Sequence, residues 1–369
     1  MRWLSLVCLT LISQMALSQH KEILFIGTYT QSGSYGIYVA AFDANTGKIS
    51  LLDSAAASNP SYLVQSPDGK KLYAIDELAG GKGGEVSSFQ YDENNYKLEF
   101  LNKQPSGGDH PCFVDIHPKG KWVAAANYSG GSLGILPVTN EGSLAPVAQF
   151  FQYTGQGPNP KRQEKPHVHQ SLFSPNGKYL WVTDLGLDEI KRYDFNPKKK
   201  LPVQENRALV LGTKPGAGPR HIALYPKKNL VYVLAEMEGA VSVFKTEQST
   251  AVLLQNIECD TVSKQPGSAA IFLSPDKKFL YVSNRADANS LTIFKIDKTS
   301  GLLEKVGGQS TLGKEPRNFV IHPSGKWLLA ANQQTNDIVV FKRDIQTGLL
   351  TPVNQKLPIR SPVCLIFAK

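Results

Sequence analysis

The chain has 369 residues, of which 41% are hydrophobic and 19% charged, and its formal net charge at pH 7 is +9. The lysines lie mostly in predicted turns, and no basic cluster with interleaved aromatic residues stands out, so the charge does not indicate a nucleic-acid-binding protein. A positive net charge does favour a small anionic ligand, because it steers such a ligand toward the protein.

Residues 1–18 have the pattern of a secretory signal peptide. Arg2 precedes a short apolar stretch, and Ala16-Leu17-Ser18 supplies small residues for cleavage before Gln19. The stretch is too short to anchor the chain in a membrane, and no other segment approaches a transmembrane span. We therefore expect a periplasmic or secreted protein with a single domain over residues 19–369 and no membrane insertion after processing.

Six similar motifs recur along the chain, each built around a proline between two apolar runs. The prolines are Pro67, Pro118, Pro175, Pro226, Pro275 and Pro323. A proline turn between two apolar runs predicts a β-hairpin. Successive prolines are 51, 57, 51, 49 and 48 residues apart, which is the repeat length of four-stranded propeller blades.

The two ends of the chain together predict one more blade. Ile23–Tyr29 and Gly36–Asp43 match the second and third strands of a blade, whereas Ser361–Phe367 matches a first strand with no second strand after it. We therefore predict an all-β, seven-bladed β-propeller with four-stranded antiparallel blades. Pairing the N-terminal strands with the C-terminal strand would close the ring and remove two exposed sheet edges. Separate β-sandwiches are the alternative, and the even spacing argues against them.

The cysteines do not indicate a disulfide framework or a zinc site. After processing, Cys112, Cys259 and Cys364 remain, an odd number at wide spacings. We expect no cofactor, and we expect a monomer because the predicted ring is closed.

The first strand of each propeller blade lines the central channel, so equivalent positions form rings around it. Counting six residues back from each proline gives Ser61, Cys112, His169, Arg220, Ala269 and Arg317, and Val363 matches in the closing blade. Counting nine or ten residues forward gives polar residues at the ends of the second strands, among them Glu77, Asn127, Glu236 and Arg285. These rings should surround one mouth of the channel.

We expect the residues of these rings and their neighbours to line a cup at the mouth of the channel. Three of them are arginines, and bringing three buried guanidinium groups together is costly in free energy unless an anion binds there. The members of the cup are His167, His169, Arg220, His221, Glu236, Arg285, Arg317, Asn127 and Glu77. Arginine binds carboxylate or phosphate through two hydrogen bonds, so a small anionic ligand is expected. Of His167 and His169 we expect only His169 to face the channel, which argues against a shared metal site.

Several motifs resemble the seven-bladed propeller lactonase family, which includes propeller-type 6-phosphogluconolactonase and the fungal carboxymuconate-lactonizing enzyme. They are Gly27-Thr-Tyr-Thr30, His110-Pro-Cys-Phe113, Ala126-Asn-Tyr-Ser-Gly-Gly131, Pro166-His-Val-His-Gln170, Gly218-Pro-Arg-His221, Ser283-Asn-Arg285 and Glu315-Pro-Arg-Asn-Phe319. The lactonizing member uses a His, an Arg, a Glu sixteen residues later and a further Arg. The matching positions here are His169, Arg220, Glu236 and Arg285.

The resemblance implies lactone hydrolysis without a metal, with a lactonizing cyclase as the alternative. Glu236 is the expected base, and His169 would polarise the carbonyl or protonate the leaving group, although these two roles could be exchanged. Arg220 and Arg285 would hold the oxyanion or a carboxylate, and Arg317 a distal phosphate. Asn127, His167, His221 and Glu77 are expected to contact the substrate.

Two other functions remain open at this point. Glu77, Asn127, Asp184 and Asn284 could hold calcium, as in the gluconolactonase and paraoxonase propellers. The propeller could also be a non-catalytic binding module. Export raises a further question, because 6-phosphogluconolactone is made in the cytoplasm. An unphosphorylated aldonolactone or a uronic-acid lactone is the alternative substrate.

Overall fold

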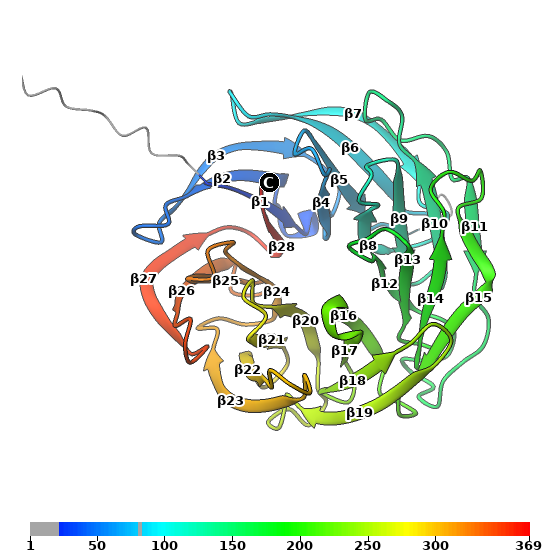
Figure 1. Ribbon diagram of the computed structural model, residues 1–369. Coiled ribbons are helices and arrows are strands. Elements are labelled where there is room, and N and C mark those ends of the chain that lie inside the picture. Colours follow the sequence, from blue (N-terminus) through cyan, green and yellow to red (C-terminus); the bar gives the residue numbers. More distant parts are fainter. Residues whose placement is uncertain (1–21, 80–82) are drawn as a thin grey trace, which may run out of the picture.

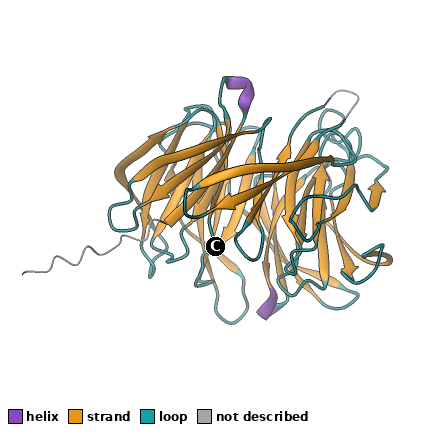
Figure 2. Cartoon of the chain, turned by 90° about the horizontal axis from the view of Figure 1, so that it is seen from above, coloured by secondary structure: helices purple, strands orange, loops and turns teal. Residues whose placement is uncertain are grey.

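The computed structural model describes residues 22–79 and 83–369, so the predicted signal peptide lies outside the described residues. Seven four-stranded antiparallel sheets are arranged as blades around a central axis (Figure 1). Seen from the side, they form a disc of inclined strands (Figure 2). The predicted seven-bladed propeller is confirmed.

Six blades each consist of four consecutive strands. The first two of them contain β4 (Leu63–Gln65), β5 (Lys71–Asp76), β6 (Glu85–Asp92) and β7 (Lys97–Pro105), then β8 (Pro111–Ile116), β9 (Trp122–Asn127), β10 (Ser132–Pro137) and β11 (Gln149–Gln152). The next two contain β12 (Val168–Phe173), β13 (Tyr179–Asp184), β14 (Glu189–Phe195) and β15 (Val203–Gly212), then β16 (Pro219–Tyr225), β17 (Leu230–Ala235), β18 (Ala240–Thr246) and β19 (Ala251–Glu258). The last two contain β20 (Ser268–Leu273), β21 (Phe279–Asn284), β22 (Ser290–Ile296) and β23 (Leu303–Ser310), then β24 (Pro316–Ile321), β25 (Trp327–Asn332), β26 (Asp337–Arg343) and β27 (Leu350–Pro358).

The remaining blade joins the two ends of the chain. Its strands lie in the order β28 (Pro362–Phe367), β1 (Glu22–Thr28), β2 (Gly36–Phe42) and β3 (Ile49–Ala56). β28 pairs antiparallel with β1, with Cys364 opposite Gly27. The predicted closure is therefore confirmed, and both strands have a hydrogen-bonded neighbour where an open sheet would have an edge.

The six proline motifs form the turns between the first and second strands of their blades. In the turn before β5, Ser66 accepts the Gly69 amide through its carbonyl, and Asp68 accepts the Lys70 amide through its side chain. In five motifs the fourth residue has a left-handed backbone, which glycine adopts at low cost and which Lys277 adopts with φ 58°. In the motif around Pro226 the fifth residue, Asn229, adopts it with φ 54°.

Helical structure in the described residues is limited to two short 3₁₀ turns, η1 (Thr30–Ser32) and η2 (Pro226–Lys228). They lie on opposite faces of the disc (Figure 2). We call the face that carries η1 and the ends of the second strands the mouth face, and the face that carries the proline motifs the turn face. In the part of the chain that the structure describes, no helix has the length and apolar character needed to cross a membrane.

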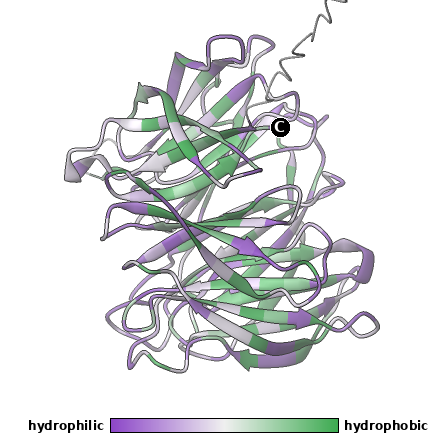
Figure 3. Cartoon of the chain, turned by 90° about the vertical axis from the view of Figure 1, so that its left-hand side faces the viewer, coloured by the Kyte–Doolittle hydropathy of each residue, from purple (hydrophilic) through white to green (hydrophobic). Residues whose placement is uncertain are grey.

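Apolar side chains fill the spaces between neighbouring blades. Seven buried clusters occur, and each contains residues of two adjacent blades. The hydrophobic residues accordingly concentrate along the strands, and the connecting loops are mostly hydrophilic (Figure 3). Cys259 and Cys364 belong to this packing, and Cys112 is buried beside His169; these three thiols are free.

A β-bulge recurs in the first strand of most blades, at the position that the sequence predicts to line the channel. In the pairing of β16 with β17, Pro219 lies opposite Ala235 and His221 opposite Leu234, so Arg220 is left out of the ladder. The same irregularity leaves out His169 in β12 and Arg317 in β24. A bulge redirects the side chain of its extra residue. The bulges therefore position these side chains independently of the sheet pairing.

Buried tyrosine hydroxyls link successive blades and allow a matched test of this packing. Tyr232 donates a 2.9 Å hydrogen bond to the Gly301 carbonyl of the next blade, and Tyr281 donates one of 2.6 Å to the Gly348 carbonyl. The Tyr281 hydroxyl also accepts a 2.7 Å hydrogen bond from buried Arg343 Nε.

We expect Tyr281→Phe to lower the free energy of unfolding by about 2–3 kcal/mol, because it leaves both a carbonyl and a guanidinium N–H without a partner. Tyr232→Phe removes one neutral hydrogen bond and should cost about 1 kcal/mol. Denaturant unfolding of both variants measures the difference. Equal losses would contradict the role assigned to Arg343.

Candidate functional site

The side chain of Glu236, buried at the mouth end of β17, is the centre of the site. Its Oε2 lies 2.9 Å from Arg220 Nε and 3.2 Å from Arg285 Nη2. His169 Nε2 is 3.9 Å from the same oxygen. The four residues predicted from the ring positions and the family resemblance therefore meet at one carboxylate.

The other oxygen of Glu236 is held by an arginine that the sequence analysis did not find. Arg162 Nη2 lies 2.6 Å from Glu236 Oε1 and 3.4 Å from the Tyr128 hydroxyl. Arg162 belongs to the connection between β11 and β12, outside the repeated hairpins. Counting from the turn prolines therefore could not reach it.

Burial and neighbouring positive charges lower the pKa values of Arg220 and His169. Burial, followed by repulsion from Arg317 and Arg285, lowers the pKa of Arg220 to about 10. Burial and then Arg220 hold the pKa of His169 well below its usual value of about 6.5. His169 is therefore a neutral imidazole at physiological pH, and its Nδ1 lies 3.6 Å from Cys112 Sγ.

Glu77 and Arg317 form a second cluster at the mouth. Glu77 Oε2 accepts hydrogen bonds from the hydroxyls of Tyr29, at 2.9 Å, and Ser61. Arg317 Nη2 lies 3.9 Å from the same oxygen, and its guanidinium lies over the Tyr29 ring at 5.3 Å from the ring centre. Tyr29 occupies the same ring position as Glu77 and Tyr128, so that count provided a signal for both tyrosines.

The predicted histidines other than His169 lie beside it and do not contact Glu236 directly. His167 stacks on Tyr128 with ring centres 4.5 Å apart, and His169 meets the same ring edge-on at 5.2 Å. Both rings therefore pack on Tyr128, and His167 Nε2 also lies 3.2 Å from Glu164 Oε1; that only His169 faces the channel stays a prediction. His221 is buried 5.3 Å from the His169 ring and packs against Phe113.

Asn127 is not brought to the Glu236 cluster. Its side chain has no exposed surface, and its amide donates to the Ser106 carbonyl and to Ser132 Oγ. Asn284 donates in the same way to the Cys259 carbonyl. These asparagines stabilise the strand ends and do not line the channel, so the prediction that Asn127 contacts the substrate is wrong.

The side chains proposed for calcium do not form a donor set. One oxygen of Asp184 accepts three backbone amides, including that of His167 at 2.8 Å. Asn127 and Asn284 are engaged within their blades, and Glu77 is shared between hydroxyls and Arg317. In residues 22–79 and 83–369, no group of three or more His, Cys, Asp or Glu side chains could hold a metal ion.

The charges at the mouth are unbalanced. Four guanidinium groups, those of Arg162, Arg220, Arg285 and Arg317, are paired with three carboxylates, those of Glu77, Glu236 and Glu315, within the described residues. A buried cation without a counterion is costly. The four guanidinium groups outnumber these three carboxylates by one, which favours an anionic ligand, and Glu164 lies nearby with Oε1 3.2 Å from His167 Nε2.

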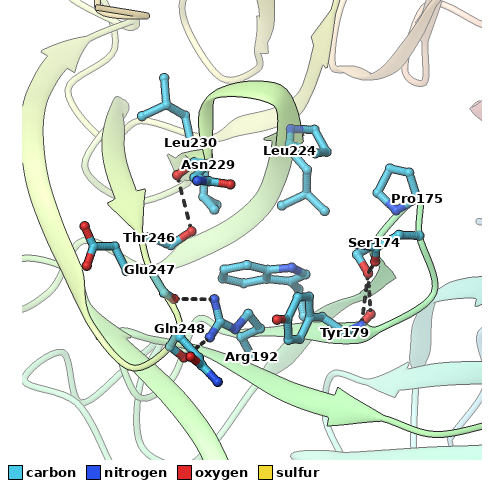
Figure 4. A pocket seen from close by; sticks show the side chains of 14 residues that line it. Ser174, Pro175, Tyr179, Arg192, Leu224, Asn229, Leu230, Thr246, Glu247 and Gln248 are labelled. Atoms are coloured by element: carbon cyan, nitrogen blue, oxygen red, sulfur yellow. Dashed lines mark hydrogen bonds between the residues drawn. The ribbon is translucent and has the colours of Figure 1, made fainter.

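A separate cavity of about 460 Å³ opens on the turn face between the β12–β15 and β16–β19 blades (Figure 4). Arg192 lies along its wall and donates to the carbonyl oxygens of Glu247 and Gln248, while its guanidinium stacks over Tyr179. This arginine joins two blades. None of the predicted site residues lines the cavity, so the convergent charges of the mouth are the candidate active site.

Comparison with known proteins agrees with this geometry. The family described as "Lactonase, 7-bladed beta-propeller" matches residues 23–367. The chain belongs to this lactonase family. Two curated relatives named 6-phosphogluconolactonase, from Formosa agariphila and Bacillus subtilis, are each 36% identical to it. The alignments cover 91% and 94% of this chain and 96% and 98% of the relatives.

A solved structure of a gluconolactonase has nearly the same fold. The periplasmic gluconolactonase of Pseudomonas aeruginosa superposes with a TM-score of 0.88 at 35% identity, covering 94% of this chain and 99% of that one. The similarity extends over nearly the whole ring. It therefore concerns the complete lactonase fold and not only the propeller repeat.

The neutral state of His169 can be tested through stability. Because its pKa is lower in the folded protein than in the unfolded chain, the unfolded chain takes up a proton below about pH 6.5 that the folded protein does not. His169→Gln removes this effect. On acidification from pH 7 to pH 5, the unmodified protein should lose stability relative to His169→Gln, by up to about 1.4 kcal/mol per pH unit.

Unfolding of the two proteins measured across this pH range gives the difference directly, and contributions of other titrating groups cancel because both proteins contain them. Parallel curves would contradict a neutral His169.

Proposed function

We propose that this protein hydrolyses a sugar-acid lactone, as a 6-phosphogluconolactonase-like enzyme, in the mouth of its central channel. The main support is the convergence of His169, Arg220 and Arg285 on Glu236. This arrangement offers a proton acceptor, two guanidinium donors for a developing oxyanion and an excess positive charge for the substrate. The family membership and the names of the relatives point to the same reaction.

In the proposed reaction, water attacks the lactone carbonyl carbon while His169 Nε2 accepts its proton. The resulting tetrahedral oxyanion is stabilised by Arg220 and Arg285. The ester C–O bond of the ring then breaks, and the imidazolium returns the proton to the leaving alkoxide. The product is an open-chain hydroxy acid, whose carboxylate the same arginines can hold.

The contacts favour His169 over Glu236 as the base. Burial alone would raise the pKa of Glu236, but three guanidinium groups, Arg285 most strongly, outweigh it and lower the pKa to about 2. Both oxygens of this carboxylate are engaged by guanidinium groups, whereas within residues 22–79 and 83–369 the polar contact of His169 Nε2 is its 3.9 Å approach to Glu236 Oε2. We therefore exchange the two roles expected from sequence, and we assign Glu236 to placing the arginines and stabilising the imidazolium.

Export would influence which lactone the enzyme meets. The predicted signal peptide and the periplasmic relative from Pseudomonas aeruginosa favour a location outside the inner membrane. An aldonolactone or a uronic-acid lactone would be available there, whereas 6-phosphogluconolactone is formed in the cytoplasm. We infer a periplasmic sugar-lactone hydrolase, with the phosphorylated lactone as the substrate to compare.

We expect His169→Ala to lower kcat for lactone hydrolysis by roughly 10²- to 10⁴-fold, the usual contribution of a general base. His167→Gln, which alters a histidine that does not reach Glu236, should have a much smaller effect. Acid release from sugar lactones measures both. A His169→Ala protein with full activity would exclude this assignment.

We also expect hydrolysis to be insensitive to metal removal, because no step above uses a metal. Treating the purified enzyme with a chelator should leave kcat/KM unchanged, and added calcium should not raise it. Activity that disappears with the chelator and returns with calcium would contradict the proposal.

A further inference from the structure

Arg162 differs from the other cations of the site in its position and exposure. Its side chain is 42% exposed, compared with 2% for Arg220, 15% for Arg285 and 16% for Arg317. It therefore forms the outermost charge of the cluster, where an incoming substrate meets the protein first.

The two carboxylate oxygens of Glu236 have different arginine partners, less exposed ones on Oε2 and a more exposed one on Oε1. Arg220 and Arg285 hold Oε2, whereas the ion pair of Oε1 among the described residues is made by Arg162 alone. The 42% exposure of the Arg162 side chain leaves part of its guanidinium open to solvent, and Glu236 keeps two other guanidinium partners when Arg162 moves away. Arg162 can therefore exchange Oε1 for another anion while Arg220 and Arg285 keep Glu236 in place.

The loop that carries Arg162 is fixed by the next residue. Gln163 has no exposed surface, and its amide donates 2.8 Å hydrogen bonds to the Leu185 carbonyl and to Asp188 Oδ1. Asp188 also accepts the amides of Gly216 and Gly218, which immediately precede the strand of Arg220. Through Asp188, the backbone next to Arg162 is therefore fixed relative to the start of β16, the strand that carries Arg220.

We propose that Arg162 determines specificity by binding a second anionic group of the lactone, a phosphate or a carboxylate remote from the ester. This inference rests on the proposed lactonase function and names its substrate class. Guanidinium binds both oxyanions through paired hydrogen bonds. Arg317 is less suited to this role, because its side chain is only 16% exposed, compared with 42% for Arg162, and its guanidinium lies over the Tyr29 ring.

The test compares three lactones: 6-phosphogluconolactone, glucarolactone, which carries a free carboxylate, and neutral gluconolactone. We expect Arg162→Gln to reduce kcat/KM for one or both charged lactones by about 10- to 100-fold, the usual loss for a charged hydrogen bond. The neutral lactone should lose clearly less than the charged ones, because it carries no second anionic group for Arg162 to bind. Arg162→Lys should retain part of the preference. Which charged lactone responds identifies phosphate or carboxylate as the group recognised.

Lys161→Gln is the matched control, since it removes an equal charge from the neighbouring exposed position of the same loop. It should leave all three rates unchanged, and thermal unfolding should show that both variants fold. An equal loss for all three lactones, or no loss for any, would overturn the role of Arg162.

Binding of the products separates this inference from the proposed function. If the unmodified protein hydrolyses none of the lactones, the proposed function is wrong. Calorimetry with 6-phosphogluconate, glucarate and gluconate still tests Arg162: it should show a preference for the first or second over gluconate that Arg162→Gln removes. An unchanged preference would refute the inference.

Discussion

The carboxylate of Glu236 is the interaction on which the site depends. Arg220 and Arg285 approach from different blades and would repel each other in a region of low dielectric constant without it. Removing one partner from a buried ion pair typically costs about 3–5 kcal/mol, because the other charge remains uncompensated. Three guanidinium groups surround this one carboxylate, and their excess of positive charge supports the proposed binding of an anionic lactone.

The fold places two of these groups without the loss of a cross-strand pair. His169 in β12 and Arg220 in β16 are bulge residues, absent from the strand ladder. Their side chains can therefore be polar or charged without loss of a cross-strand pair, while the residues on either side keep the blade packed. Circular closure through β1 and β28 then brings positions from distant parts of the sequence to one axis.

Repeat spacing was sufficient to predict the seven blades, the closure of the ring and the meeting of His169, Arg220, Glu236 and Arg285. It failed where the side chains depart from the repeat. Asn127 and Tyr128 are neighbours at the end of one strand, yet alternation turns the first into its blade and the second toward the histidines. Arg162 lies in a connecting loop with no counterpart in other blades, so only the folded structure shows it at Glu236.

A crystal structure of the protein with a sugar-acid product bound would test the central claim most directly. The account predicts that the product carboxylate lies within hydrogen-bonding distance of Arg220 or Arg285 and next to His169, in the mouth of the channel. A product bound in the turn-face cavity beside Arg192, with the arginine contacts of Glu236 unchanged and no ligand near them, would contradict it.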